Sequence, residues 1–110
     1  MAASIQAGRI VAVDQRETLS DGTAGGIEAD AITFDACRTL VDDWVLVTED
    51  EIRQAMVRVF DNHRLVIEGA AAVTVAGFLK LAPHFPGKTV VLVICGGNID
   101  GTRFKTIVCA

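Results

Sequence analysis

The sequence predicts an α/β fold, and three observations support this prediction. Short β-rich runs alternate with segments whose apolar residues recur at helical spacing. The longest β-rich run, residues 89–94, is continuously aliphatic or β-branched, which is typical of a parallel strand covered on both faces. The chain has 110 residues, the size of one small domain, and contains no internal repeat. We therefore expect a short, mostly parallel sheet flanked by helices.

The first forty residues predict short elements on both sides of a glycine-rich loop. Residues 1–8 are a helical stub that ends at Gly8, and residues 10–13 are a β-rich run. Residues 20–27 contain three glycines and form the loop. Residues 30–41 predict a helix whose apolar face points toward a core, and this face consists of Ile32, Ala36, Cys37, Leu40 and Val41.

The clearest helix start lies in the middle of the chain, after a β-rich run at residues 44–47. Thr48 and Glu51 have the spacing of a capping box, in which the hydroxyl and the carboxylate each accept a hydrogen bond from a free backbone N–H group. A helical apolar face follows at Ile52, Met56, Val59 and Phe60.

The last part of the chain predicts a second helix, a loop and two further β segments. Residues 69–81 are rich in Ala and Val and carry no charge before Lys80, so we expect this helix to be buried on most sides. Two prolines end it, and the strand at residues 89–94 follows. Residues 102–110 could extend as a strand.

Composition excludes several classes of function. The net charge of −4 and the absence of a Lys and Arg cluster predict no nucleic-acid partner. The apolar runs are shorter than the roughly 20 residues that a spanning helix needs, which predicts no membrane partner. Three cysteines without metal-ligand spacing predict no disulfide framework, no metal site and a cytoplasmic setting. The mean hydropathy of +0.42 indicates more apolar surface than one small core can hide, which favours a partner.

The leading candidate site is the turn Cys95, Gly96, Gly97 and Asn98. It follows the predicted strand at residues 89–94, and ligands of open α/β sheets bind beyond the carboxyl ends of strands. The two glycines let backbone approach a ligand closely, and Cys95 adds a thiol. The alternative is that Cys95 is a buried small apolar residue before a tight turn.

Five short blocks occur in order along the chain, at residues 20–24, 40–43, 47–52, 65–70 and 95–100. Their sequences, order and spacing resemble the pyridoxal-phosphate-dependent threonine dehydratase and serine racemase family over roughly residues 4 to 100. The resemblance implies part of a tryptophan synthase β-like fold, known as fold type II. It also implies that residues 1–110 are a single truncated carboxyl-terminal dehydratase-like domain.

The resemblance implies pyridoxal phosphate as cofactor and a set of cofactor-binding residues. Cys95 stands where the family places a Ser or Cys against the pyridine nitrogen, and a neutral thiol there suits β-elimination. Gly22 matches a glycine beside the cofactor ring, and Glu68 matches an acidic residue near the pyridine side. Gly96 and Gly97 shape the turn. The alternative for Glu68 is a solvated or helix-capping carboxylate.

Other reactive side chains predict no catalytic role. His63 and His84 lie apart in the sequence and have no partnered Ser or Cys motif, so we expect them at the surface or at helix ends. Asp42 and Asp43 are expected in a solvated turn rather than as paired catalytic carboxylates. Trp44 is expected as a core or interface anchor, as is Phe60.

The resemblance also requires a Schiff-base lysine and a phosphate-binding loop, which we expect from segments preceding residue 1. Lys80, Lys88 and Lys105 have no family motif around them. The sequence therefore predicts no catalytic residue within the chain, and whether the chain alone is an enzyme stays open.

Three functions are consistent with these features. The first is a fragment or subunit of a serine/threonine dehydratase, an ammonia-lyase that gives a 2-oxo acid, inactive until an amino-terminal dehydratase portion joins it. The second is a non-catalytic remnant that self-associates as a homo-oligomer through exposed apolar faces. The third is a small-molecule-binding module, suggested by the α/β alternation and the glycine-rich loops.

Overall fold

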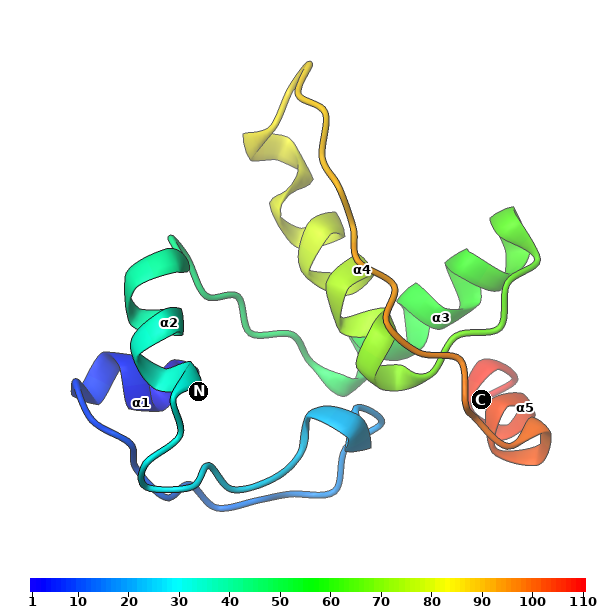
Figure 1. The fold of residues 1–110 in the computed structure, drawn as a ribbon. Helices are drawn as coiled ribbons and strands as arrows, with labels where there is room; N and C mark the ends of the chain where they lie inside the picture. Colours follow the sequence, from blue (N-terminus) through cyan, green and yellow to red (C-terminus); the bar gives the residue numbers. More distant parts are fainter. The chain divides into compact units, whose positions relative to one another are not determined.

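The computed structural model describes residues 1–110 and divides the chain into two compact units. The first unit comprises Met1–Arg16 and Ala24–Val45, and the second comprises Glu17–Thr23 and Leu46–Ala110. Figure 1 shows that all regular structure is helical.

The first unit contains helices α1 (Ala2–Ala7) and α2 (Thr33–Leu40), which contact each other. The predicted stub is confirmed, because α1 ends at Gly8 with a left-handed φ of 68°. The predicted core-facing side of α2 is wrong. Ile32 is 89% exposed, and no residue of α2 is buried, because the six-residue α1 is the only element of this unit that packs on α2.

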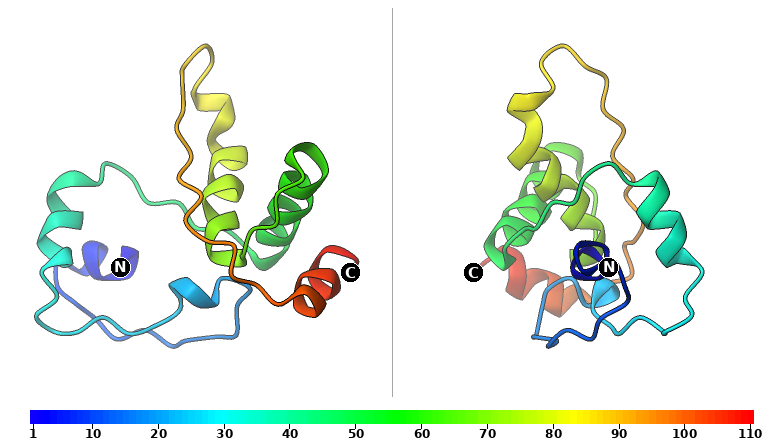
Figure 2. Two further views of the ribbon diagram at one scale, coloured as in Figure 1. Left: turned by 45° about the vertical axis from the view of Figure 1, so that its right-hand side comes forward. Right: turned by 90° about the vertical axis from the view of Figure 1, so that its left-hand side faces the viewer.

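The second unit holds the hydrophobic core, which is centred on α3 (Glu49–His63) and α4 (Gly69–Leu81). Both views in Figure 2 show these two helices packed together. Small alanines of α4 and larger apolar side chains of α3 belong to this core, and Met56 of α3 is fully buried in it. The buried apolar residues are Ile52, Ala55, Met56, Val59, Ile67, Ala71, Ala72, Ala76, Phe104 and Ile107.

Both central helices have the predicted character. α4 has the predicted bounds, and none of its residues before Leu79 is exposed. The 3-10 helix η2 (Ala82–His84), with Pro83 in its first turn, follows α4 directly. Three of the four predicted apolar positions of α3 are buried, and the fourth, Phe60, packs edge-to-face against Phe104 with ring centroids 5.5 Å apart.

The capping box of α3 is confirmed. The Glu51 N–H donates to Thr48 Oγ1 at 3.2 Å, and the Thr48 N–H donates to Glu51 Oε2 at 2.7 Å. Lys80 Nζ lies 3.2 Å from Glu51 Oε1 and 3.0 Å from the Leu46 carbonyl oxygen. The Thr48 N–H, and then Lys80, lower the pKa of Glu51 from its ordinary value.

The predicted strand at residues 102–110 is wrong, because these residues lie almost entirely in α5 (Gly101–Val108) and its end. Asp100 caps this helix: its Oδ1 accepts the N–H groups of Thr102 and Arg103 at 2.9 and 3.0 Å. One apolar face, with Phe104 and Ile107, then reaches the core. Capping and amphipathic spacing therefore outweigh the β-branched composition of the segment.

The predicted parallel sheet is also wrong, since the structure contains no β-strand. Residues 10–13, 44–47 and 89–94 belong to no regular element, and Val91 in the last of them is 82% exposed. A strand exists only through hydrogen bonds to a neighbouring strand. One backbone bond, from the Glu68 N–H to the Gly96 carbonyl at 3.2 Å, joins two of the connecting segments.

Candidate functional site

Glu68 lies at the centre of the predicted site, at the N-cap position of α4. Its backbone N–H donates to the Gly96 carbonyl at 3.2 Å, and its carboxylate Oε2 accepts the Asn98 N–H at 3.1 Å. These two bonds fasten the glycine turn to the start of α4. The helix-capping alternative does not describe the side chain, because Glu68 makes no capping hydrogen bond to α4.

Glycines surround the Glu68 carboxylate on two sides. A Cβ added to Gly96 would overlap the carboxylate, so this position has no room for a side chain. A Cβ added to Gly22 would lie 3.7 Å from Glu68 Oε1 and 3.1 Å from Ala70 Cβ. Sequence positions 22, 68 and 96 therefore meet at one place, although 74 residues (96 − 22) separate the first from the last.

The two remaining predicted residues, Cys95 and Gly97, flank Gly96. Cys95 is exposed and its thiol is free, which contradicts its interpretation as a buried apolar residue. A Cβ added to Gly97 would lie 3.1 Å from the Val66 carbonyl oxygen, which is a tight approach. Cys95 is brought near Glu68 by chain connectivity to Gly96, since consecutive Cα atoms are about 3.8 Å apart.

The loop that carries Gly22 forms the 3-10 helix η1 (Asp21–Thr23), which packs on α4. Ser20 is buried, its Oγ lies 2.5 Å from Thr23 Oγ1, and its carbonyl accepts the Thr23 N–H at 2.9 Å. A Cβ added to Gly69 would overlap the Leu19 carbonyl. Backbone packed on backbone therefore fixes the distance between this loop and the start of α4.

Three polar contacts of this loop, made by two partner residues, were not predicted. Glu49 of α3 accepts a hydrogen bond from Thr18 Oγ1 and another from the Leu19 N–H, each at 2.7 Å. Arg103 of α5 forms an ion pair with Asp21 at 2.7 Å. The partners are about 30 and 82 residues apart in sequence, so no local pattern could have revealed them.

A cavity of about 100 Å³ lies beside the Glu68 carboxylate. Its size suits a few water molecules rather than a whole cofactor. The lining residues come from η1, from the start of α4 and from the segment leading into α5, and they are Leu19, Asp21, Glu68, Gly69, Asn98, Ile99, Asp100 and Arg103.

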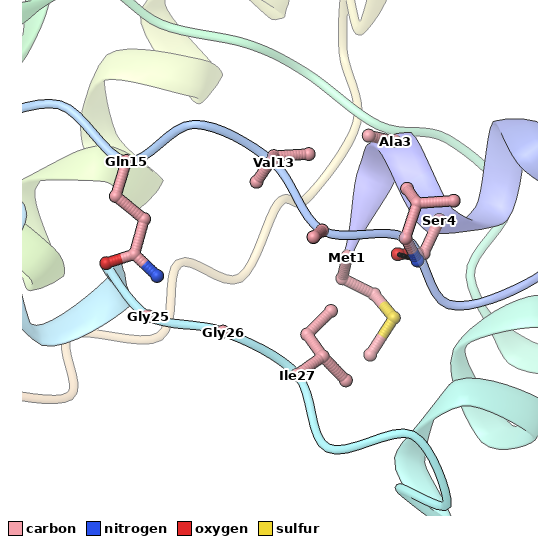
Figure 3. Close-up of a pocket in the computed structure, with 10 residues that line it drawn as sticks. Met1, Ala3, Ser4, Val13, Gln15, Gly25, Gly26 and Ile27 are labelled. Atoms are coloured by element: carbon pink, nitrogen blue, oxygen red, sulfur yellow. Dashed lines mark hydrogen bonds between the residues drawn. The ribbon is translucent and has the colours of Figure 1, made fainter.

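The first unit contains a separate pocket of about 200 Å³, shown in Figure 3. Met1 and Ile27 supply apolar surface to it, and Gln15 supplies an amide. Ser4 is buried at its edge, where its Oγ accepts the Val11 N–H at 3.1 Å. None of the predicted site residues lines this pocket.

The histidines and the paired aspartates lie as expected, whereas Trp44 is 36% exposed and does not belong to the core. His63 is the last residue of α3, His84 lies in η2, and both are exposed. Asp42 and Asp43 are exposed, and Asp43 accepts the Trp44 N–H at 2.7 Å. No helix is both long enough and apolar enough to cross a membrane.

The chain is similar to proteins of known family in both sequence and structure. The model of the family "pyridoxal-phosphate dependent enzyme" matches residues 1–96. The crystal structure of serine racemase from Dictyostelium discoideum superposes with a TM-score of 0.76 at 32% identity, over 89% of this chain and 31% of that chain. This neighbour is a fold type II enzyme. The chain therefore belongs to the family of pyridoxal-phosphate-dependent enzymes.

Within this family, the relatives are threonine dehydratases. The catabolic L-threonine dehydratase of Escherichia coli is 39% identical over 97% of this chain and 33% of its own length. The L-threonine ammonia-lyase of Thermotoga maritima is 39% identical over 98% of this chain and 26% of its own length. The chain thus spans between a quarter and a third of these relatives, matching their carboxyl-terminal part.

Proposed function

We propose that this chain forms the cofactor-ring side of a pyridoxal-phosphate site in a dehydratase that acts on serine or threonine. A companion portion of the enzyme supplies the Schiff-base lysine and the phosphate-binding loop. In this proposal residues 1–110 act as one carboxyl-terminal domain of a cytoplasmic enzyme.

The observation that carries the proposal is the Glu68 carboxylate held between Gly22 and Gly96. Three separate parts of the chain converge here, and two of them present backbone without side chains. The two glycines let these segments pack closely around a fixed polar group, because Glu68 and Ala70 take the space that their Cβ atoms would fill. The family match supports pyridoxal phosphate as the ligand that this cluster would border once the companion portion is in place.

Each residue has a defined part in the proposal. Cys95 would lie against the pyridine nitrogen as a neutral partner, and Gly22 would lie beside the ring. Glu68 would place negative charge on the pyridine side and, through its bond to the Asn98 N–H, keep the turn at residues 95–98 in place. Pyridoxal phosphate, when bound, supplies the electron sink for eliminating the β-hydroxyl group of the amino acid.

Exposed apolar segments support the need for a companion portion. Val90, Val91, Val93 and Ile94 are all at least 38% exposed, as are Leu65 and Val66 on another connecting segment. An extended segment rich in aliphatic side chains is stabilised when neighbouring strands pair with its backbone and other elements cover both of its faces. We propose that strands of the companion portion cover these segments.

The test is reconstitution. The chain is mixed with a separately purified amino-terminal portion of the Escherichia coli dehydratase and pyridoxal phosphate, and 2-oxo acid is measured with threonine and with serine. We expect a complex and product from the mixture, and no product from either part alone. A stable complex that binds the cofactor but yields no product from either amino acid would refute the dehydratase assignment.

A pair of glycine variants distinguishes an effect on the candidate site from a general effect on folding. Gly96→Ala places a methyl group where the Glu68 carboxylate lies, so we expect loss of cofactor binding and product. Gly77→Ala adds the same methyl group in α4, where nothing lies within 4 Å, so we expect full activity. Equal activity of the two variants would show that the glycine-flanked carboxylate has no role in binding.

A second candidate function is self-association without catalysis, which the exposed segment at residues 89–94 favours. Two copies could pair these segments edge to edge. Light scattering across a range of concentrations measures the association. A monomer at the highest soluble concentration rejects this candidate, whereas a dimer that the companion portion cannot displace favours it over the dehydratase.

A further inference from the structure

The loop leading to Gly22 is held by one carboxylate on another element of the same unit. Glu49 Oε1 accepts from Thr18 Oγ1, and Glu49 Oε2 accepts from the Leu19 N–H, both at 2.7 Å. Thr18 Oγ1 in turn accepts the Ser20 N–H at 3.1 Å. Three consecutive residues of the loop therefore depend on one side chain of α3.

These contacts lead by short steps to the candidate site. The Leu19 carbonyl packs directly on Gly69, next to Glu68 in the chain. Ser20 is buried and begins the turn that carries Gly22 toward the Glu68 carboxylate. A shift at Leu19 would therefore move Gly22 relative to Glu68.

Capping of α3 does not require Glu49. The capping box is complete with Thr48 and Glu51, and Glu49 forms no part of it. An acidic residue in the first helical turn interacts favourably with the helix dipole, but that interaction needs only charge and no particular orientation. The two short hydrogen bonds of Glu49 to a loop thirty residues away need a particular acceptor geometry.

We propose that Glu49 is a positioning residue, whose carboxylate sets the place of Gly22 beside Glu68 and thereby shapes the cofactor-ring side of the site. The link to the cofactor depends on the proposed function, whereas the link to the loop does not. Neutral glutamine retains an acceptor for the Leu19 N–H and can donate to the Thr18 hydroxyl, so it should substitute for glutamate. Alanine provides neither contact.

The test compares Glu49→Ala, Glu49→Gln and the matched control Asp50→Ala in the intact chain. Asp50 lies in the same helical turn and carries the same charge, but it bonds Arg53 and Gln54 instead of the loop. Hydrogen exchange of the Leu19, Ser20 and Thr23 amides reports on the loop, and exchange of the α3 amides reports on the helix. Because alanine removes both hydrogen bonds to the loop, we expect Glu49→Ala to speed loop exchange about tenfold or more.

The proposal requires that Glu49→Gln keep loop exchange within about threefold of the wild type and that Asp50→Ala leave it unchanged. It is overturned if alanine at position 49 leaves loop exchange unchanged, or if glutamine and alanine have equal effects, since charge alone would then account for them. A second readout is the fluorescence of pyridoxal phosphate titrated into the reconstituted complex, where the alanine variant should bind about tenfold more weakly and the glutamine variant normally. If the wild-type complex binds no cofactor, the proposed function fails, and the exchange data still decide the role of Glu49 in the loop.

Discussion

Arg103 and Asp21 form an ion pair with a distance of 2.7 Å, although 82 residues separate them in the sequence. The pair joins the first turn of α5 to η1, the short helix that contains Gly22. Its side chains are 48% and 59% exposed, so water and salt screen the attraction strongly. We therefore assign to this ion pair mainly the orientation of α5 toward η1, and only a small contribution to the stability of the fold.

We therefore expect Arg103→Ala to lower the free energy of unfolding by less than about 1 kcal/mol. Urea titration followed by circular dichroism measures this difference. It should vanish in about 1 M salt, where the Debye length is about 3 Å. A larger loss that persists in high salt would mean that the aliphatic part of the arginine contributes packing.

Two glycines of α4 should respond in opposite ways to the same substitution. A methyl group at Gly69 would overlap the Leu19 carbonyl, so we expect Gly69→Ala to destabilise the chain by about 3 kcal/mol, at the upper end of the range for overpacking. Gly77 has open space around its Cα, so Gly77→Ala should stabilise by up to about 1 kcal/mol through helix propensity. Thermal unfolding of both variants checks the signs, and a neutral Gly69→Ala would contradict the close packing of loop on helix.

Met56 should be the most sensitive core position of α3, because it is the largest fully buried side chain of the protein. We expect Met56→Ala to cost about 2–5 kcal/mol, since the cavity adds to the lost burial. Val91→Ala is the matched control at a residue that is 82% exposed, and it should change stability by less than about 0.5 kcal/mol. Comparable losses from both variants would show that Val91 is covered in solution.

The capping box predicts the direction of one pH effect. Hydrogen bonding from the Thr48 N–H and the charge of Lys80 hold the pKa of Glu51 below its ordinary value of 4.5. The resulting stabilisation is therefore fully present above that ordinary value, and it is lost as the pH falls through the lowered pKa. Glu51→Gln keeps the box but removes the charge, so it should be less stable than wild type at neutral pH and nearly equal to it in strong acid. Urea unfolding midpoints of the wild type and of Glu51→Gln, measured from neutral pH to strong acid, check this expectation. A difference between the two midpoints that does not change with pH would refute it.

The helices of the second unit could be predicted because their signals are local. Thr48 and Glu51 specify where α3 begins, and the Ala-rich run between Gly69 and the two prolines specifies α4. These signals act within a few residues and need no information about the rest of the structure. For α5, the β-branched residues suggested a strand, whereas Asp100 and the spacing of Phe104 and Ile107 produced a helix.

The strands could not be predicted correctly because pairing is not a property of one segment. Residues 89–94 have every local feature of a buried strand, yet within these 110 residues they have no strand as a neighbour. For a similar reason, only part of the candidate site could be predicted. The positions of Gly22, Glu68 and Gly96 followed from family resemblance, but Glu49 and Arg103 act through contacts that only the folded chain creates.

The exposed apolar run at residues 89–94 also has a kinetic consequence. Helices α3 and α4 are consecutive in the chain and contact each other directly, so their association requires closing only a short loop and is expected to be fast. In the reconstitution, pairing of the run with strands of the added companion portion is a bimolecular step, whose rate falls as that partner becomes dilute. Assembly would then proceed in two stages, with a concentration-independent helical stage first and a concentration-dependent stage that completes the cofactor site second.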